Sequence, residues 1–207
     1  MHARTVSIDL KPFTLIGATT RAGMLTAPLR SRFGIAHHLK HYNEEDLLTI
    51  AVRSAAILNV EADVAALSMV AGRSRGTPRI ANRLLRRVRD YAQVKRAGSI
   101  DEPSVEESLA LEGVDHLGLD ELDRTYLRII GTTYRGGPVG LETIAASMGE
   151  DAGALEGVVE PFLLQLGLLA RTRRGRMITD AGAGHVGLRI ERAESERAAS
   201  ADEALFD

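Results

Sequence analysis

From residue 43 to residue 112 the apolar residues recur every three or four positions, which is the spacing of amphipathic helices. Asn43 is suited to cap the first helix, because three acidic residues follow it near the positive end of the helix dipole. The apolar stripe expected for this helix consists of Leu48, Val52, Ala55 and Leu58. Further helices are predicted over 63–71, from 77 to about 96, and from 103 to 112. The pattern therefore predicts a small all-helical unit of four helices.

The helix that starts at Thr77 is strongly basic. Thr77 offers a capping hydroxyl, and Pro78 suits the first helical position. The cations of this segment are Arg79, Arg83, Arg86, Arg87, Arg89, Lys95 and Arg96, against one acid, Asp90. Like charges crowded on a helix repel one another, and Arg79 lies in the first turn, where a cation opposes the helix dipole. A solvated helix face is one interpretation, and a phosphate bound near Arg79 is the other.

A second pattern follows a glycine-containing linker at 113–118. The predicted helices span 120–134, 141–148 and 152–166. Pro161 interrupts the last of them, because proline removes a donor from the helical ladder. Two short strands at 168–172 and 177–179 then flank a basic turn that contains glycine. Three helices followed by a hairpin are typical of a winged helix.

Four arginines gather in and around that turn. Arg171, Arg173, Arg174 and Arg176 lie within six residues and have no acid among them. Guanidinium groups on a protruding hairpin reach phosphates or a minor groove, and arginine suits bidentate contact with phosphate. The alternative is a solvated charged turn. The winged-helix order of elements favours contact with a nucleic acid.

The pattern of apolar and polar residues at the two ends of the chain differs from the helical pattern of its middle. The segment from Thr14 to Thr20 is apolar at first and then small and polar, which predicts a short buried strand of the kind found in parallel sheets. The rest of the chain predicts no further strand–helix–strand unit, so the strand either pairs unusually or is the C-terminal part of an α/β domain. The polar segment 189–207 predicts a disordered tail.

Composition excludes several classes of protein. The 207 residues contain no cysteine, which excludes disulfides, cysteine-based zinc sites and a thiol nucleophile. His37, His38 and His41 lie close together but lack a further ligand at the right spacing, so no metal site is expected. No apolar run approaches the roughly 18 residues that a membrane span needs. Neither a nucleophile elbow nor a Walker-type glycine loop occurs in the sequence.

The motifs together resemble the RuvB family of bacterial Holliday-junction branch-migration ATPases over about residues 5–188. The matching segments are 17–23, 27–34, 75–87, 136–141 and 171–177. The resemblance implies a mainly α fold that comprises the end of an AAA+ α/β core, a small helical AAA+ lid and a C-terminal winged helix with a β-hairpin wing. The corresponding boundaries are 1–36 for the core piece, 37–112 for the lid, 113–118 for the linker, 119–188 for the winged helix and 189–207 for the tail.

The resemblance also implies roles for individual residues. Thr20, or else Thr19, matches the sensor-one position, and Arg32, or else Arg30, matches an arginine finger that acts on a neighbouring subunit. Two further nucleotide-contacting positions fall on Tyr42 and on Arg79, the latter matching sensor two. In the wing, the DNA-contacting positions fall on Arg171 and Arg176, and Arg173 and Arg174 are additional candidates.

Cofactors and partners follow from the same resemblance. The intact family protein uses ATP with Mg²⁺, forms a homo-hexamer on four-way junction and duplex DNA, works with RuvA and RuvC, and is cytoplasmic. The family's Walker A and Walker B motifs precede the segment that begins at Thr14, so this polypeptide is not expected to hydrolyse ATP by itself. The alternative function is a stand-alone winged-helix DNA-binding protein, which would not need a sensor-two arginine or a finger.

Overall fold

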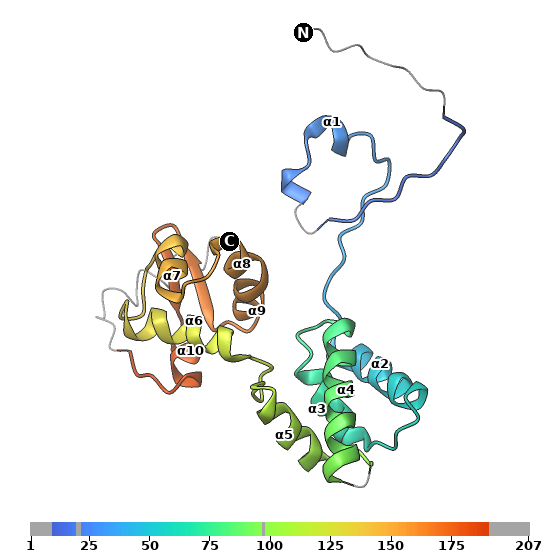
Figure 1. The fold of residues 1–207 in the computed structure, drawn as a ribbon. Helices are drawn as coiled ribbons and strands as arrows, with labels where there is room; N and C mark the ends of the chain where they lie inside the picture. Colours follow the sequence, from blue (N-terminus) through green and yellow to red (C-terminus); the bar gives the residue numbers. More distant parts are fainter. Residues whose placement is uncertain (1–9, 20–21, 97, 191–207) are drawn as a thin grey trace. The chain divides into compact units, whose positions relative to one another are not determined.

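The computed structural model describes residues 10–19, 22–96 and 98–190 (Figure 1). The chain divides into two units, one from Met1 to Lys40 and one from His41 to Asp207. No helix in the described part of the chain is long and apolar enough to cross a membrane. Each unit is described by itself below.

The first unit contains little regular structure. Its described elements are the 3₁₀ turn η1 (Ala22–Met24) and the short helix α1 (Ala27–Arg30). The strand predicted from Thr14 is wrong for the residues that the structure describes up to residue 19, which form no strand. The side chains of Leu15 and Ile16 are 63% and 88% exposed. A strand is held by its neighbours, and the described residues of this unit provide none.

Four helices begin the second unit, at places that the sequence predicts. They are α2 (Glu44–Ile57), α3 (Val64–Gly72), α4 (Pro78–Lys95) and α5 (Glu102–Leu111). Asn43 caps α2, because its Oδ1 accepts from the backbone N–H of Asp46 at 2.7 Å. The predicted stripe of α2 is partly correct, because Ala55 is buried and Leu48 and Leu58 pack against the core. Leu47 and Ala51 face the core while Val52 is 44% exposed.

The winged helix follows, with its hairpin drawn in orange in Figure 1. Its helical elements are α6 (Glu121–Thr132), α7 (Leu141–Met148), α8 (Ala152–Ala154), the π-helical segment η2 (Leu155–Val159), α9 (Glu160–Gln165) and α10 (Asp180–His185). The predicted interruption near Pro161 is confirmed, because the widened π turn immediately precedes α9, which carries the proline in its first turn. The core forms around Tyr126, Leu127 and Leu163.

The hairpin consists of β1 (Leu169–Thr172) and β2 (Gly175–Ile178), paired antiparallel with Arg171 opposite Arg176. The turn is thus Arg173 and Arg174 alone, shorter than predicted. The loop after α6 adds a third extended segment. The N–H of Val139 donates to the carbonyl of Arg176 at 3.0 Å, and the N–H of Arg176 donates back at 2.8 Å. A Cβ on Gly175 would lie 2.5 Å from the Val139 carbonyl oxygen, so this close approach requires glycine.

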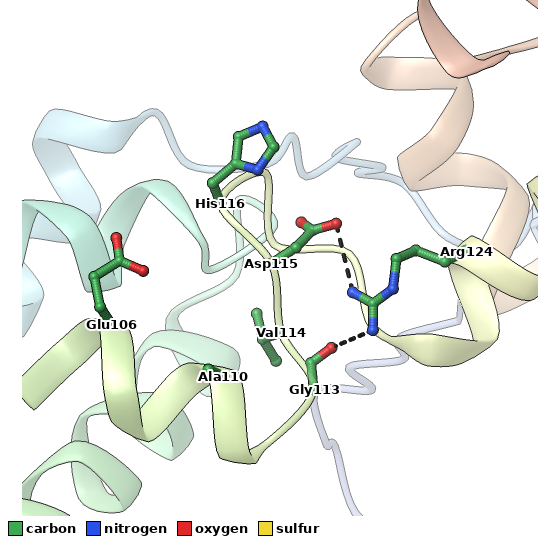
Figure 2. A pocket seen from close by; sticks show the side chains of 7 residues that line it. All are labelled: Glu106, Ala110, Gly113, Val114, Asp115, His116 and Arg124. Carbon is green, nitrogen blue, oxygen red and sulfur yellow. Dashed lines mark hydrogen bonds and ion pairs between the residues drawn. The ribbon is translucent and has the colours of Figure 1, made fainter. Parts of the chain in front are cut away.

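The segment predicted as a linker is held by side-chain contacts. Figure 2 shows Arg124 of α6 reaching back to Asp115 and to the carbonyl of Gly113. The distances from its Nη atoms to these two oxygens are 3.5 Å and 2.8 Å. On the other side, the Nε2 of His185 lies 2.7 Å from the Oδ2 of Asp115. The segment therefore connects α5 to α6 as an ordered turn.

Candidate nucleotide-facing and DNA-facing sites

The wing arginines divide into two pairs. Arg171 and Arg176 both contact the carboxylate of Glu160, which lies on α9 and is 0% exposed. The Nε atoms of the two arginines lie 2.8 Å and 2.9 Å from its oxygens. Glu156 adds longer contacts at 3.3 Å and 3.4 Å. These two guanidinium groups therefore hold both strands of the hairpin to α9, close to its turn, as well as carrying charge.

Glu160 is kept ionised by its partners. Burial by itself would raise its pKa, but hydrogen bonds from Arg176, Tyr126 and Arg171 and the charge of Arg171 outweigh burial and hold the pKa below its usual range. The hydroxyl of Tyr126, on α6, donates to the same carboxylate. One buried acid thus joins α6, α9 and both strands of the wing.

Arg173 and Arg174 form the tip of the hairpin. Both side chains are exposed, and no ion pair is found for either within residues 10–19, 22–96 and 98–190. The turn is fixed beneath them, because the Oγ1 of Thr172 donates to the carbonyl of Gly175 and accepts from the N–H of Arg174. The tip presents two cations on an ordered backbone, an arrangement that suits phosphate oxygens.

On the helical unit, Tyr42 and Arg79 are placed near each other by one loop. The backbone N–H of Tyr42 donates to the carbonyl of Gly76 at 2.9 Å. Arg79 lies three residues further on, in the first turn of α4, and is exposed. The predicted capping role of Thr77 is wrong, because its hydroxyl donates to the carbonyl of Arg75 instead. The N-terminal amides of α4 therefore have no side-chain cap.

The cations of α4 and its C-cap residue Arg96 differ in how they are paired. Arg87, Arg89 and Arg96 contact Glu112, Asp90 and Glu107 at 3.5 Å, 2.6 Å and 2.7 Å respectively. Within the described ranges, no acid pairs with Arg79, Arg83 or Arg86, which share one face of the helix at positions i, i+4 and i+7. The face that begins at Arg79 thus carries cations that have no acidic partner among the residues described.

The candidates in the first unit are only partly described. Arg30 donates from Nη2 to the carbonyl of Ala22 at 2.8 Å, and Arg32 is exposed just after α1. Thr19, the alternative sensor-one position, lies within the described residues and has an interaction partner. Thr20, the preferred sensor-one position, lies outside the described residues.

Sequence reasoning missed four residues at these sites, namely Arg75, Asp123, Tyr126 and Glu160. Glu160 stands alone as an acid between Val159 and Pro161, and such an acid gives no functional signal in the sequence. The only cue was Pro161 itself, which marks the place where the helix is interrupted. Arg75 and Asp123 are 48 residues apart, so only the fold brings them together.

Three family models match consecutive parts of this sequence. Residues 1–39 match the Holliday junction DNA helicase RuvB P-loop domain, residues 42–115 match the RuvB AAA lid domain, and residues 116–187 match the RuvB C-terminal winged helix domain. The chain belongs to the RuvB family. The predicted fold class, a helical AAA+ lid followed by a winged helix with a hairpin wing, is confirmed.

Solved structures of the RuvB family agree. The Thermotoga maritima RuvB Holliday junction branch migration motor is 49% identical, with a TM-score of 0.83 over 87% of this chain and 60% of its own. A lysine-to-arginine mutant of the same protein is also 49% identical, with a TM-score of 0.85 over 90% of this chain and 62% of its own. This chain thus spans about three-fifths of the length of the RuvB structures that it matches.

Proposed function

We propose that this chain forms the nucleotide-sensing and DNA-gripping part of an ATP-dependent Holliday junction branch-migration motor that acts in DNA recombination and repair. The observation that carries the proposal is the hairpin tip, where Arg173 and Arg174 have no acidic partner among the described residues and lie on a turn anchored by Thr172. Membership of the RuvB family supports it. The substrate of the wing is the phosphate backbone of duplex or four-way junction DNA.

Arg171 and Arg176 have a second part in this function. Their Nε atoms face Glu160, while the side chain of Arg171 is still 42% exposed and that of Arg176 is 19% exposed. Arg171 therefore has surface left for a phosphate, and Arg176 acts chiefly by fixing the strand. The tip arginines, Arg173 and Arg174, contact the phosphate backbone of the DNA first, and Arg171 extends this contact towards α9.

The nucleotide role is assigned to the loop of Tyr42 and the first turn of α4. Arg79 has no acidic partner among the residues described, so it fits the phosphates of ATP. Arg32, with Arg30 as the alternative, is proposed as the finger for a neighbouring subunit of a homo-hexamer, and Thr20, with Thr19 as the alternative, as sensor one. Bound ATP supplies the phosphoryl group whose transfer to water, with ADP as the leaving group, drives the motor.

Magnesium is not assigned to residues of this chain. Within the described ranges, no group of three histidine or acidic side chains lies close enough to hold a metal ion. The family partners RuvA and RuvC belong to the whole motor, so they enter as part of the proposal for an assembly that includes this chain.

The test is the salt dependence of DNA binding by the 207-residue chain. Affinity for a fluorescent four-way junction is measured by anisotropy from low to moderate salt, for the wild type and for Arg173→Ala with Arg174→Ala. Each lost phosphate contact reduces the slope of log K against log salt by about 1. We expect the double variant to bind more weakly to all sequences and its slope to be about 2 smaller.

Arg53→Ala is the matched control, because Arg53 is an exposed arginine of α2, away from the hairpin in sequence. This control should leave the slope unchanged. An unchanged slope in the tip variant, or an equal loss in the control, would overturn the assignment of the wing. Junction binding that is no tighter than binding of an unrelated acidic polymer would overturn the DNA function itself.

A further inference from the structure

Arg75 of the lid contacts the winged helix. It belongs to the loop between α3 and α4, and its side chain is 14% exposed. Its Nη2 lies 3.1 Å from the Oδ1 of Asp123, and its Nη1 lies 3.6 Å from the Oδ2 of Asp120. Its guanidinium carbon stacks 4.4 Å from the centre of the Phe162 ring. One arginine of the lid thus reaches both α6 and α9.

The backbone at Arg75 is held in an uncommon conformation. Its φ is +54°, a left-handed value that costs a non-glycine residue of order 1 kcal/mol or more. Such a conformation persists where surrounding contacts over-determine it. The loop is also fitted closely from the other side, because a Cβ on Gly118 would lie 2.7 Å from the carbonyl oxygen of Arg73. The loop and the start of the winged helix therefore pack backbone against backbone.

The same loop faces the proposed nucleotide site. Gly76, the next residue, accepts the hydrogen bond from Tyr42, and Arg79 follows three residues later. On the winged-helix side, Asp123 and Tyr126 lie one turn apart on α6. Phe162 lies two residues from Glu160 on α9. Arg75 thus contacts α6 and α9 within one turn of Tyr126 and Glu160. Through these two helices it is connected to the Glu160 carboxylate, which holds the wing.

We propose that Arg75 is a positioning residue that locks the nucleotide-facing loop of the lid to the winged helix, so that the wing moves with Tyr42 and Arg79 as one body. The functional role of this lock rests on the proposed function, but the contacts that form the lock do not. A lock of this kind transmits any displacement of the loop to the hairpin, because the residues between them are packed and hydrogen-bonded.

The experiment measures the distance between the two parts directly. The chain contains no cysteine, so Arg53→Cys on α2 and Glu142→Cys on α7 give two specific sites for spin labels. Electron–electron double resonance on this doubly labelled chain should give one narrow distance distribution. A broad distribution in the chain that is otherwise unchanged would overturn the lock.

Two replacements at position 75 then separate charge from backbone effects. Aspartate and asparagine both tolerate the left-handed conformation, but Arg75→Asp places a third acid beside Asp120 and Asp123. We expect the narrow peak to be lost in Arg75→Asp and to broaden less in Arg75→Asn. A folded Arg75→Asp chain that keeps the narrow peak would refute the proposal. Should Arg75→Asp fail to fold, Arg75→Asn decides in the same way: an unchanged peak overturns the lock.

Controls keep this test apart from that of DNA binding. Arg87→Asp changes an exposed arginine of α4 that pairs within the lid, and it should leave the distribution unchanged. Arg75→Asn retains both tip arginines, so its salt slope for DNA should equal that of the wild type. If the wild-type chain failed to bind DNA but showed the narrow peak that Arg75→Asp loses, the lock would stand and the proposed function would fall.

Discussion

Two buried carboxylates of the winged helix both contact arginine, and yet their pKa values are shifted in opposite directions. Glu160 and Asp123 are 0% and 1% exposed. Glu160 accepts from two arginines and a tyrosine, which overcome burial and keep its pKa low. For Asp123, burial dominates over the charge of Arg75, the nearby charge of Asp120 adds to burial, and the pKa rises to about 6. Burial beside an arginine thus does not fix the ionisation of an acid; the number of donors and the like charges nearby decide it.

The largest expected effect is the removal of the acid that holds the wing. Glu160→Ala leaves two guanidinium groups and the Tyr126 hydroxyl without their buried partner, which should lower the free energy of unfolding by about 3–5 kcal/mol. Urea unfolding followed by circular dichroism measures this change. Glu156→Ala is the control, because Glu156 is 51% exposed and contacts the same arginines. It should cost less than about 1 kcal/mol, and equal losses would contradict the distinction.

Asp123 should give a pH dependence of its own. Its folded pKa is raised from 3.8 to about 6, so its protonated form favours the folded state, and this contribution is lost as pH rises between these values. The stability of the wild type relative to Asp123→Asn should therefore fall by about 2 kcal/mol from pH 4 to pH 7. Unfolding free energies of both proteins across this range measure the effect. A difference that is constant with pH would refute the raised pKa.

Glu160→Gln should show the opposite sign and a smaller effect. Because the folded pKa of Glu160 is lowered, its contribution is present above its unfolded value and is lost as pH falls below it. The advantage of the wild type over Glu160→Gln should then shrink on acidification from about pH 5. The same unfolding series records it, and an advantage that grows on acidification would show that the two acids do not differ.

The smallest effect is expected from an exposed pair. Arg87 and Glu112 lie 3.5 Å apart with side chains 57% and 43% exposed. Arg87→Ala should change the free energy of unfolding by less than about 0.5 kcal/mol, because solvent and salt screen such pairs. A loss comparable to that of Glu160→Ala would mean that exposure does not separate the two kinds of ion pair in this protein.

The elements that the sequence predicted correctly depend on local signals. Asn43 before a run of acids and Pro78 at a first turn both mark a helix start that needs no distant partner. How deeply Leu47 and Leu48 are buried depends on where neighbouring helices lie, and the predicted stripe therefore missed Leu47 and wrongly included Val52. The strand expected from Thr14 needs partner strands, and the described residues near it supply none.

The candidate sites show the same division. A basic turn on a hairpin is visible in the sequence as four arginines, and their residue types indicate phosphate contact. Which of them are engaged is not visible, because Glu160 reaches Arg171 and Arg176 from another element. The same holds for Arg75, whose partners lie more than 40 residues away. Local chemistry can be recognised from a sequence, whereas the pairing of charges depends on tertiary structure.

The third extended segment beside β2 has a thermodynamic consequence. Val139 and Arg176 exchange two backbone hydrogen bonds, so the hairpin is already ordered before any ligand arrives. Ordering a loop on binding costs conformational entropy for each residue that is fixed. A hairpin ordered in advance avoids most of that loss. Phosphate contacts of the kind proposed for the wing would therefore lose little free energy to the ordering of the hairpin.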